Sequence, residues 1–204
     1  MIESSVLDEL ATRYHTTRQN VAREYCQHLF LANLYKLGNL KAERLLFKGG
    51  TALRIIHQSP RFSEDLDFSS FGLAKKDIED IFISGLDEIE KSGIATNLTE
   101  AKETSGGYLG KAYFKLFDFR VEIMIQVQAK QEKRAKGEVR LVSSDFIPAY
   151  NLLVLPEEIL VGEKMIAAVT RAKPRDFYDV YFILRKNLLA AGNKKILPDV
   201  LEKT

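Results

Sequence analysis

The chain has 204 residues, of which 46% are hydrophobic and 28% are charged, and its formal net charge is +2 at pH 7. This composition is typical of a folded globular domain and excludes a disordered chain. The charge balance excludes a chain that is basic throughout, so an anionic partner would need a local basic patch. The single cysteine, Cys26, is expected in the core, and the sequence offers no zinc-ligand cluster. Because neither a signal-peptide pattern nor an apolar run of ~18 residues is present, we expect a cytoplasmic protein.

The first sixty residues predict helices around one short strand. Residues 4–37 carry apolar side chains at spacings of three and four, and this helical run ends at Gly38. The segment "RLLFKGG" predicts a strand that enters a glycine turn. "TALRIIHQ", residues 51–58, then predicts a helix for which Thr51 is placed as the cap.

The middle of the chain predicts a second strand, a helix and then a sheet. "EDLDFSS", residues 64–70, predicts the strand, and residues 74–93 predict an amphipathic helix that ends at a glycine. From 94 to 147 the alternation of apolar and polar residues predicts strands. The charged stretch 129–140 predicts a hairpin or a loop.

Helical patterns return at residue 156 and continue to about 189. We therefore expect two parts, an α/β core with an N-terminal helical segment over residues 1–155 and a helical subdomain over residues 156–204 that completes the site. The fold class is α+β, with a mixed sheet.

Two aspartates on the second strand are the first candidates for chemistry. Asp65 and Asp67 stand two positions apart, so their side chains project to the same side of a strand. Paired carboxylates repel each other unless a cation lies between them, and Mg²⁺ suits such a pair because it prefers oxygen ligands. Taken alone, the pair is equally consistent with solvated carboxylates in a turn.

Two further features favour a site. "KGGT" places glycines where a helix begins, so that backbone N–H groups can approach phosphate oxygens, although a tight strand-to-helix turn would look the same. Glu122, flanked by apolar residues in "RVEIM", is either a third metal ligand or part of an exposed strand face. The order Gly-Gly-Thr, Asp-Leu-Asp-Phe and a distant apolar-Glu-apolar strand matches the pattern of the polymerase-β-like nucleotidyltransferase fold.

The sequence resembles a more specific family. "FKGGTALR", "RFSEDLDF", the "VEI" strand and "EILVGEKMIAAVTRAKPRDFYDVYFIL" look like the four motifs of the AbiEii/AbiGii-type abortive-infection toxins, which include MenT-like nucleotidyltransferases of type IV toxin–antitoxin systems. The resemblance covers about 47 to 184. It implies a polymerase-β-like nucleotidyltransferase core with N-terminal helices and a helical C-terminal part.

The resemblance assigns roles to residues of the first three motifs. Gly49, Gly50 and Thr51 match the turn that holds the triphosphate, while the two aspartates match the paired metal ligands. Glu122 matches the third acidic position, and the hydroxyl of Ser63 could face the triphosphate or the metal.

In the last motif, Lys164 matches a lysine that acts as a point charge against the triphosphate. Arg171, Arg175 and Asp176 also match. Asp176 could pair with Arg175, orient Lys164 or contact the nucleotide. Asp179 lies on the same helix face and has either a structural or a functional role.

Arg54 follows Thr51 by one helical turn. It could address the phosphates or form a salt bridge with Asp65 or Glu64.

The activity implied by the resemblance is transfer of a nucleoside monophosphate from an NTP to an acceptor hydroxyl, with Mg²⁺ or Mn²⁺ as cofactor. The implied acceptor is the 3′ end of a tRNA, and the implied protein partner is a cognate antitoxin. Two alternatives stay open: transfer to a protein or a small molecule, and a nucleotide-binding or antitoxin-binding module without turnover.

Overall fold

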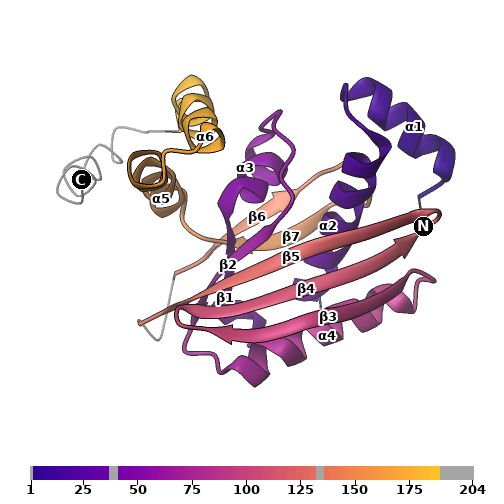
Figure 1. Ribbon diagram of the computed structural model, residues 1–204, viewed down its shortest axis with the longest axis horizontal. Coiled ribbons are helices and arrows are strands. Elements are labelled where there is room, and N and C mark those ends of the chain that lie inside the picture. The colour runs from indigo at the N-terminus through magenta and orange to yellow at the C-terminus, as the bar shows by residue number, and fades with distance from the viewer. Residues whose placement is uncertain (1, 37–40, 132–135, 189–204) are drawn as a thin grey trace.

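The computed structural model describes residues 2–36, 41–131 and 136–188. Among the described residues, two helices come first, strands and helices then alternate as far as α4, and the strands β3 to β7 follow one another before two final helices (Figure 1). In chain order the elements are α1 (Ser4–Arg13), α2 (Arg18–Lys36), the short 3₁₀ helix η1 (Ala42–Arg44), β1 (Leu45–Lys48), α3 (Gly49–His57), β2 (Leu66–Phe71), α4 (Lys75–Glu90), β3 (Ala95–Thr104), β4 (Gly107–Leu116), β5 (Phe119–Lys130), β6 (Glu138–Val142), β7 (Tyr150–Val154), α5 (Glu157–Thr170) and α6 (Pro174–Arg185).

The described strands form a single mixed sheet in the order β3-β4-β5-β2-β1-β7-β6. β3, β4 and β5 form an antiparallel meander, and β5 then runs parallel to β2. β2 is antiparallel to β1, which is parallel to β7. The strand that carries Asp67 therefore lies in the middle of the sheet, between β5 and β1.

The core lies on one face of this sheet, under α2 and α4 (Figure 1). Phe82 of α4 is its centre, because its ring lies 5.7 Å from Phe30, 5.9 Å from Phe68 and 5.8 Å from Tyr108. Cys26 is fully buried in the same core, as predicted. Since Phe68 points into the core, the pleat of β2 directs its neighbour Asp67 to the opposite face.

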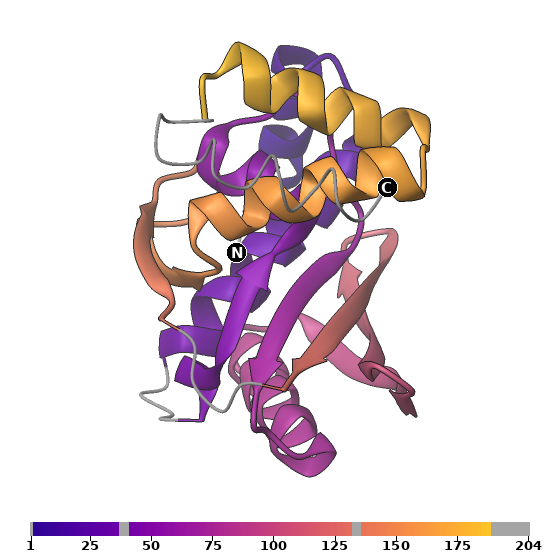
Figure 2. The same cartoon turned by 90° about the vertical axis from the view of Figure 1, so that its left-hand side faces the viewer.

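Beyond β2 the opposite face of the sheet carries polar side chains. Along β5 the residues alternate strictly, with Val121, Ile123, Ile125 and Val127 buried and the residues between them exposed. The final helices α5 and α6 pack against each other beside the end of the sheet where β1 ends and β2 begins (Figure 2). Among the described residues, no helix combines the length and apolarity needed to cross a membrane.

The predicted mixed α/β class with helices at both ends is confirmed. Three local predictions differ from the structure. The N-terminal helical run is interrupted after Arg13, because His15 has a left-handed backbone (φ 51°) and the hydroxyl of Thr17 accepts the Asn20 N–H as a new cap. α2 ends at Lys36, and the predicted stop at Gly38 lies outside the described residues.

The second difference is that α3 begins at Gly49, so Thr51 lies inside its first turn and is not the cap. The third is that β7, which follows the stretch 94–147 in which the alternation predicts strands, is also a strand of the sheet and pairs with β1.

Candidate active site

The glycine turn joins β1 to α3 and is packed too closely to hold larger residues. Gly49 has a φ of +87°, and a Cβ atom there would lie 2.1 Å from Oδ2 of Asp67. A Cβ atom on Gly50 would lie 2.5 Å from Nη2 of Arg61 and 3.0 Å from Oγ of Ser63. The glycines therefore let the Asp67 carboxylate and the 61–63 segment approach the first turn of α3. The N–H groups of such a turn have no partner within the helix and favour an anion.

Thr51 connects this turn to the first aspartate. Its side chain is fully buried, and its hydroxyl donates a hydrogen bond to the backbone carbonyl of Asp65. This bond positions the residue just before β2. The hydroxyl is therefore used within the protein.

The two aspartates lie at the start of β2. Asp65 directly precedes the strand, and Asp67 is in register with Lys48 of β1 and Gln126 of β5. Burial raises the pKa of Asp65, an effect that Arg175 partly offsets. Burial also raises the pKa of Asp67; the charge of Lys164 partly offsets this effect, and repulsion from Asp65 adds to it. Both shifts indicate carboxylate charge that the protein does not fully compensate.

Hydrogen bonds from α2 hold the segment before β2 in place. The side-chain amide of Gln27 donates to the carbonyl oxygens of Ser63 and Glu64, both at 3.0 Å. Because these bonds fix the backbone, the Ser63 hydroxyl is directed toward Gly50 at the start of α3. Ser63 is thus placed beside the glycine turn, as its position before the aspartates suggested.

A buried carboxylate organises two cations on the opposite side of the site. Asp179 of α6 has a side chain that is only 2% exposed. Its two oxygens accept bonds from Arg61 at 2.9 and 3.1 Å, and one of them accepts a bond from Nζ of Lys164 at 2.8 Å. Asp179 therefore fixes Lys164 and Arg61 together, the role that the sequence assigned in part to Asp176.

Asp176 has a different partner. It accepts two bonds from Arg171, at 2.5 and 3.0 Å, and one from the backbone N–H of Lys173, the residue that caps the start of α6. The bond from Arg171 lowers the pKa of Asp176. The expected pair between Asp176 and Arg175 does not form, and Arg175 is exposed where its charge acts on Asp65.

These groups line one small cavity of about 80 Å³. Four cations and four carboxylates face it. Most of the residues predicted for the site line this cavity. The lining residues are Gly50, Arg61, Ser63, Asp65, Asp67, Gln126, Lys164, Arg171, Arg175, Asp176 and Asp179. The structure thus brings segments of α3, β2, α5 and α6 to one place.

Glu122 does not lie in this place. The residue of β5 opposite Asp67 is Gln126, and Glu122 is four residues further along the strand, about 13 Å away. Its side chain is half-exposed and pairs with Arg120 at 3.2 Å. The structure therefore corrects the expectation that Glu122 stands with the aspartates. The sequence pattern could not show the register that puts an amide at this position.

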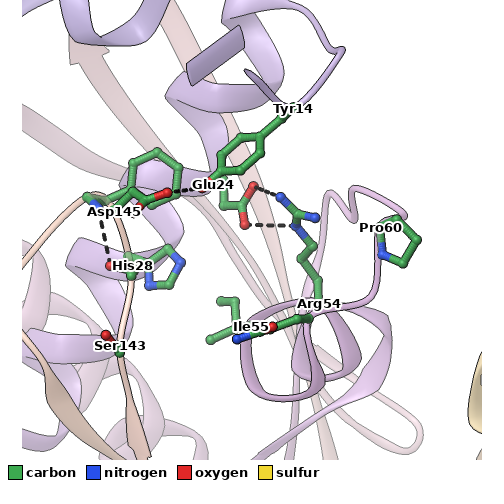
Figure 3. Close-up of a pocket in the computed structure, with 11 residues that line it drawn as sticks. Tyr14, Glu24, His28, Arg54, Ile55, Pro60, Ser143 and Asp145 are labelled. Carbon is green, nitrogen blue, oxygen red and sulfur yellow. Dashed lines mark hydrogen bonds and ion pairs between the residues drawn. The ribbon is translucent and has the colours of Figure 1, made fainter. Parts of the chain in front are cut away.

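Arg54 also lies elsewhere, at the far end of α3. Its guanidinium binds the carboxylate of Glu24 at 2.8 and 3.0 Å and covers the ring of Phe62 at 4.1 Å. The salt bridges expected with Asp65 or Glu64 are not formed, and Arg54 does not line the cavity at the aspartates. Figure 3 shows this pair in a separate cavity of about 520 Å³, with Tyr14 bound to Asp145 across it.

A second charged cluster adjoins the aspartates and was not predicted. Lys48 is buried, and its ammonium group binds Glu163 of α5 at 2.9 and 3.0 Å and Gln128 at 2.7 Å. Lys130 binds the same carboxylate at 3.1 Å. Burial opposes ionisation of Glu163, but the two lysines hold its pKa below the usual range. This cluster ties α5 to the sheet directly beside Lys164.

The donor set at β2 is consistent with a hard divalent cation. Within the described part of the chain, no group of three or more His, Cys, Asp or Glu residues is arranged to hold a metal. Mg²⁺ is usually bound by only one or two carboxylates together with substrate phosphates and water. Asp65 and Asp67 provide such a pair, and their raised pKa values are what a cation would reverse.

The mixed sheet carries paired aspartates next to a glycine turn, and cations on α5 and α6 face these aspartates. This arrangement is typical of nucleotidyltransferase-like folds. The comparisons agree with this class. Residues 34–204 match the family described as nucleotidyl transferase AbiEii toxin of type IV toxin–antitoxin systems. The chain therefore belongs to the AbiEii family.

Similar proteins are distant in sequence. An uncharacterised protein of Aquifex aeolicus is 25% identical over 139 residues, which cover 68% of this chain and 57% of that protein. Among solved structures, the nucleotidyltransferase toxin MenT4 of Mycobacterium tuberculosis has a TM-score of 0.63 at 18% identity, over 88% of this chain and 63% of that one. JHP933 of Helicobacter pylori has a TM-score of 0.56 at 20% identity, over 83% and 67%. The chain thus spans less than two thirds of the length of the first two relatives, and the structural likenesses show the fold alone.

Proposed function

We propose that the chain is a metal-dependent nucleotidyltransferase that acts as the toxin of a toxin–antitoxin pair and transfers a nucleoside monophosphate from an NTP to the 3′ end of an RNA, a tRNA in particular. The observation that carries this proposal is the juxtaposition of Asp65 and Asp67 with the glycine turn of α3 and with cations on α5 and α6. Family membership supports the same activity and implies an antitoxin partner.

The phosphate-binding side consists of the α3 turn and four cations. Backbone N–H groups at the start of α3 would bind triphosphate oxygens. Lys164 and Arg61, both oriented by Asp179, would face the same oxygens, and the exposed guanidinium of Arg175 would reach the outer phosphates. Positioning and charge neutralisation of this kind supply most of the acceleration in phosphoryl-group transfer.

Asp65 and Asp67 would hold Mg²⁺ or Mn²⁺, which would supply positive charge against the charge of the reacting phosphate. An acceptor hydroxyl forms a bond to the α-phosphorus as the bond to the β-phosphate oxygen breaks. Pyrophosphate leaves, and the hydroxyl proton passes to solvent. Gln126, which is next to Asp67, can donate or accept a hydrogen bond but cannot take up this proton as a base.

The test is incubation of the protein with each α-³²P-labelled NTP and Mg²⁺ in the presence of total tRNA and total protein. The proposal expects label at RNA 3′ ends and none with Asp67→Asn. Label that enters protein and never RNA would refute the RNA acceptor. Absence of transfer to any acceptor, with retained NTP binding, would favour a binding module.

A further inference from the structure

The sheet face formed by β3, β4 and β5 continues from the aspartates and is not covered by α2 or α4, which lie behind these strands in Figure 1. We propose that this face binds the 3′-terminal single strand of the RNA acceptor and guides its last hydroxyl to Asp67. The inference rests on the proposed function, because it locates the acceptor of that reaction. The argument combines the direction of attack, the continuity of the surface, and its charge and aromatic content.

The direction of attack follows from the position of the phosphate-binding groups. In transfer to the α-phosphorus, the entering oxygen and the leaving pyrophosphate lie on opposite sides of the phosphorus, roughly in line. The α3 turn, Lys164 and Arg171 lie on one side of Asp67, so the leaving group belongs there. The entering hydroxyl must then come from the other side, where β5 and β4 continue the sheet.

The surface is continuous between the site and this face. A second cavity, of about 330 Å³, shares Asp67 and Gln126 with the first and extends over β4 and β5. Leu109 and Gln128 line it on the face that carries Asp67. An acceptor nucleotide in this cavity would be next to Asp67.

The register of the meander shows which side chains continue the path. Gln126 is opposite Leu109, and Leu109 is opposite Lys102. Further along β4, Lys111, Tyr113 and Lys115 follow on the same face because they alternate with core residues. From Gln126 to Arg120 the face extends about 20 Å along β5, which is room for a short single strand.

The charges of this face suit a phosphate backbone. Its basic residues are Lys102, Lys111, Lys115 and Arg120, and its acidic residues are Glu100 and Glu122. The two acids pair with Lys111 at 2.6 Å and with Arg120 at 3.2 Å. Lys102 and Lys115 are exposed and form no ion pair within the part of the chain that the structure describes, so they are available to phosphates.

The same face offers surfaces on which bases can stack. The guanidinium of Arg120 lies 4.9 Å from the ring centre of Tyr113, and Met124 beside them is 37% exposed. Bases of single-stranded RNA stack on aromatic rings and on guanidinium planes without regard to sequence. Cations and a stacking pair on an open sheet favour a single strand over an acidic protein segment, which has no bases to stack.

The test is the steady-state kinetics of label transfer from NTP to total tRNA. We compare Lys102→Glu and Lys115→Glu with Lys76→Glu, which makes the same charge change on an exposed residue of α4, on the other side of the sheet. Tyr113→Leu tests stacking while it keeps an apolar side chain. The KM for RNA should rise about 10-fold in the three face variants, a change of about 1.4 kcal/mol. kcat and the KM for NTP should stay within 2-fold of wild type, roughly.

The salt dependence of RNA affinity is a second measurement on the two lysine variants. Each lost phosphate contact should reduce the slope of log affinity against log salt by about 0.7. If both variants show the KM and slope of Lys76→Glu while wild type labels RNA, this inference is refuted and the proposed function stands. If wild type labels no RNA, the proposed acceptor and this inference both fail.

Discussion

Replacement of Asp179 by asparagine should both destabilise the protein and slow transfer. The carboxylate is 2% exposed and accepts two bonds from Arg61 and one from Lys164, whose side chains are 24% and 12% exposed. Removal of one partner from a buried ion pair costs about 3–5 kcal/mol. Because both cations keep some contact with water, we expect a loss of about 3 kcal/mol in the free energy of unfolding.

Urea denaturation measures this loss. With an m-value of about 3 kcal/mol/M, the midpoint should fall by about 1 M. Asp87→Asn, an exposed aspartate in α4, should change the free energy by less than about 0.5 kcal/mol. In activity assays below the new midpoint, kcat should fall because Lys164 is no longer oriented. An Asp179→Asn protein with wild-type stability and kcat would refute the reasoning.

Three further predictions follow from the site and the core. Asp67→Asn should abolish transfer without lowering the melting temperature. Burial raises the pKa of Asp67, so its ionised form lowers the stability of the protein at pH 7. A lower melting temperature of the variant would contradict the claim that the charge of Asp67 is not fully compensated. Gly49→Ala should reduce transfer at least about 10-fold, since its Cβ would displace Asp67. Gly85→Ala in α4, whose Cβ would lie 3.8 Å from Leu34, should not, and equal activities of the two variants would contradict the close approach of Gly49 to Asp67. Burial lowers the pKa of His28 to about 4, so the unfolded state binds its proton first as the pH falls below 6.5. Between pH 6.5 and 4 the free energy of unfolding should therefore lose about 3 kcal/mol, and His28→Asn but not His15→Asn should remove that loss in pH-dependent denaturation.

The parts of the fold that follow from local patterns could be predicted from the sequence. The strand around Ile123 alternates with a period of two, and α4 ends before Gly93 as its pattern indicates. The segments of the glycine turn and of β2 also meet as expected, because the short chain between them limits their separation. These are properties of neighbouring residues.

Features that depend on strand register and on long-range pairing could not be predicted. Glu122 has the right surroundings in sequence, but the pairing of β2 with β5 places Gln126 beside Asp67 instead. Likewise, the packing of α6 against α5 places Asp179 next to Lys164, while Asp176 pairs with Arg171. The fixed spacing of three residues between the two aspartates was the signal that both could matter, and only the packing distinguishes them.

The most direct test of the account is a crystal structure with a non-hydrolysable NTP and Mn²⁺, in which the anomalous signal locates the metal. The account predicts Mn²⁺ bound by Asp65 and Asp67, with the triphosphate against the first turn of α3 and facing Lys164. Mn²⁺ at Glu122, or a triphosphate in the cavity beside Arg54, would contradict it.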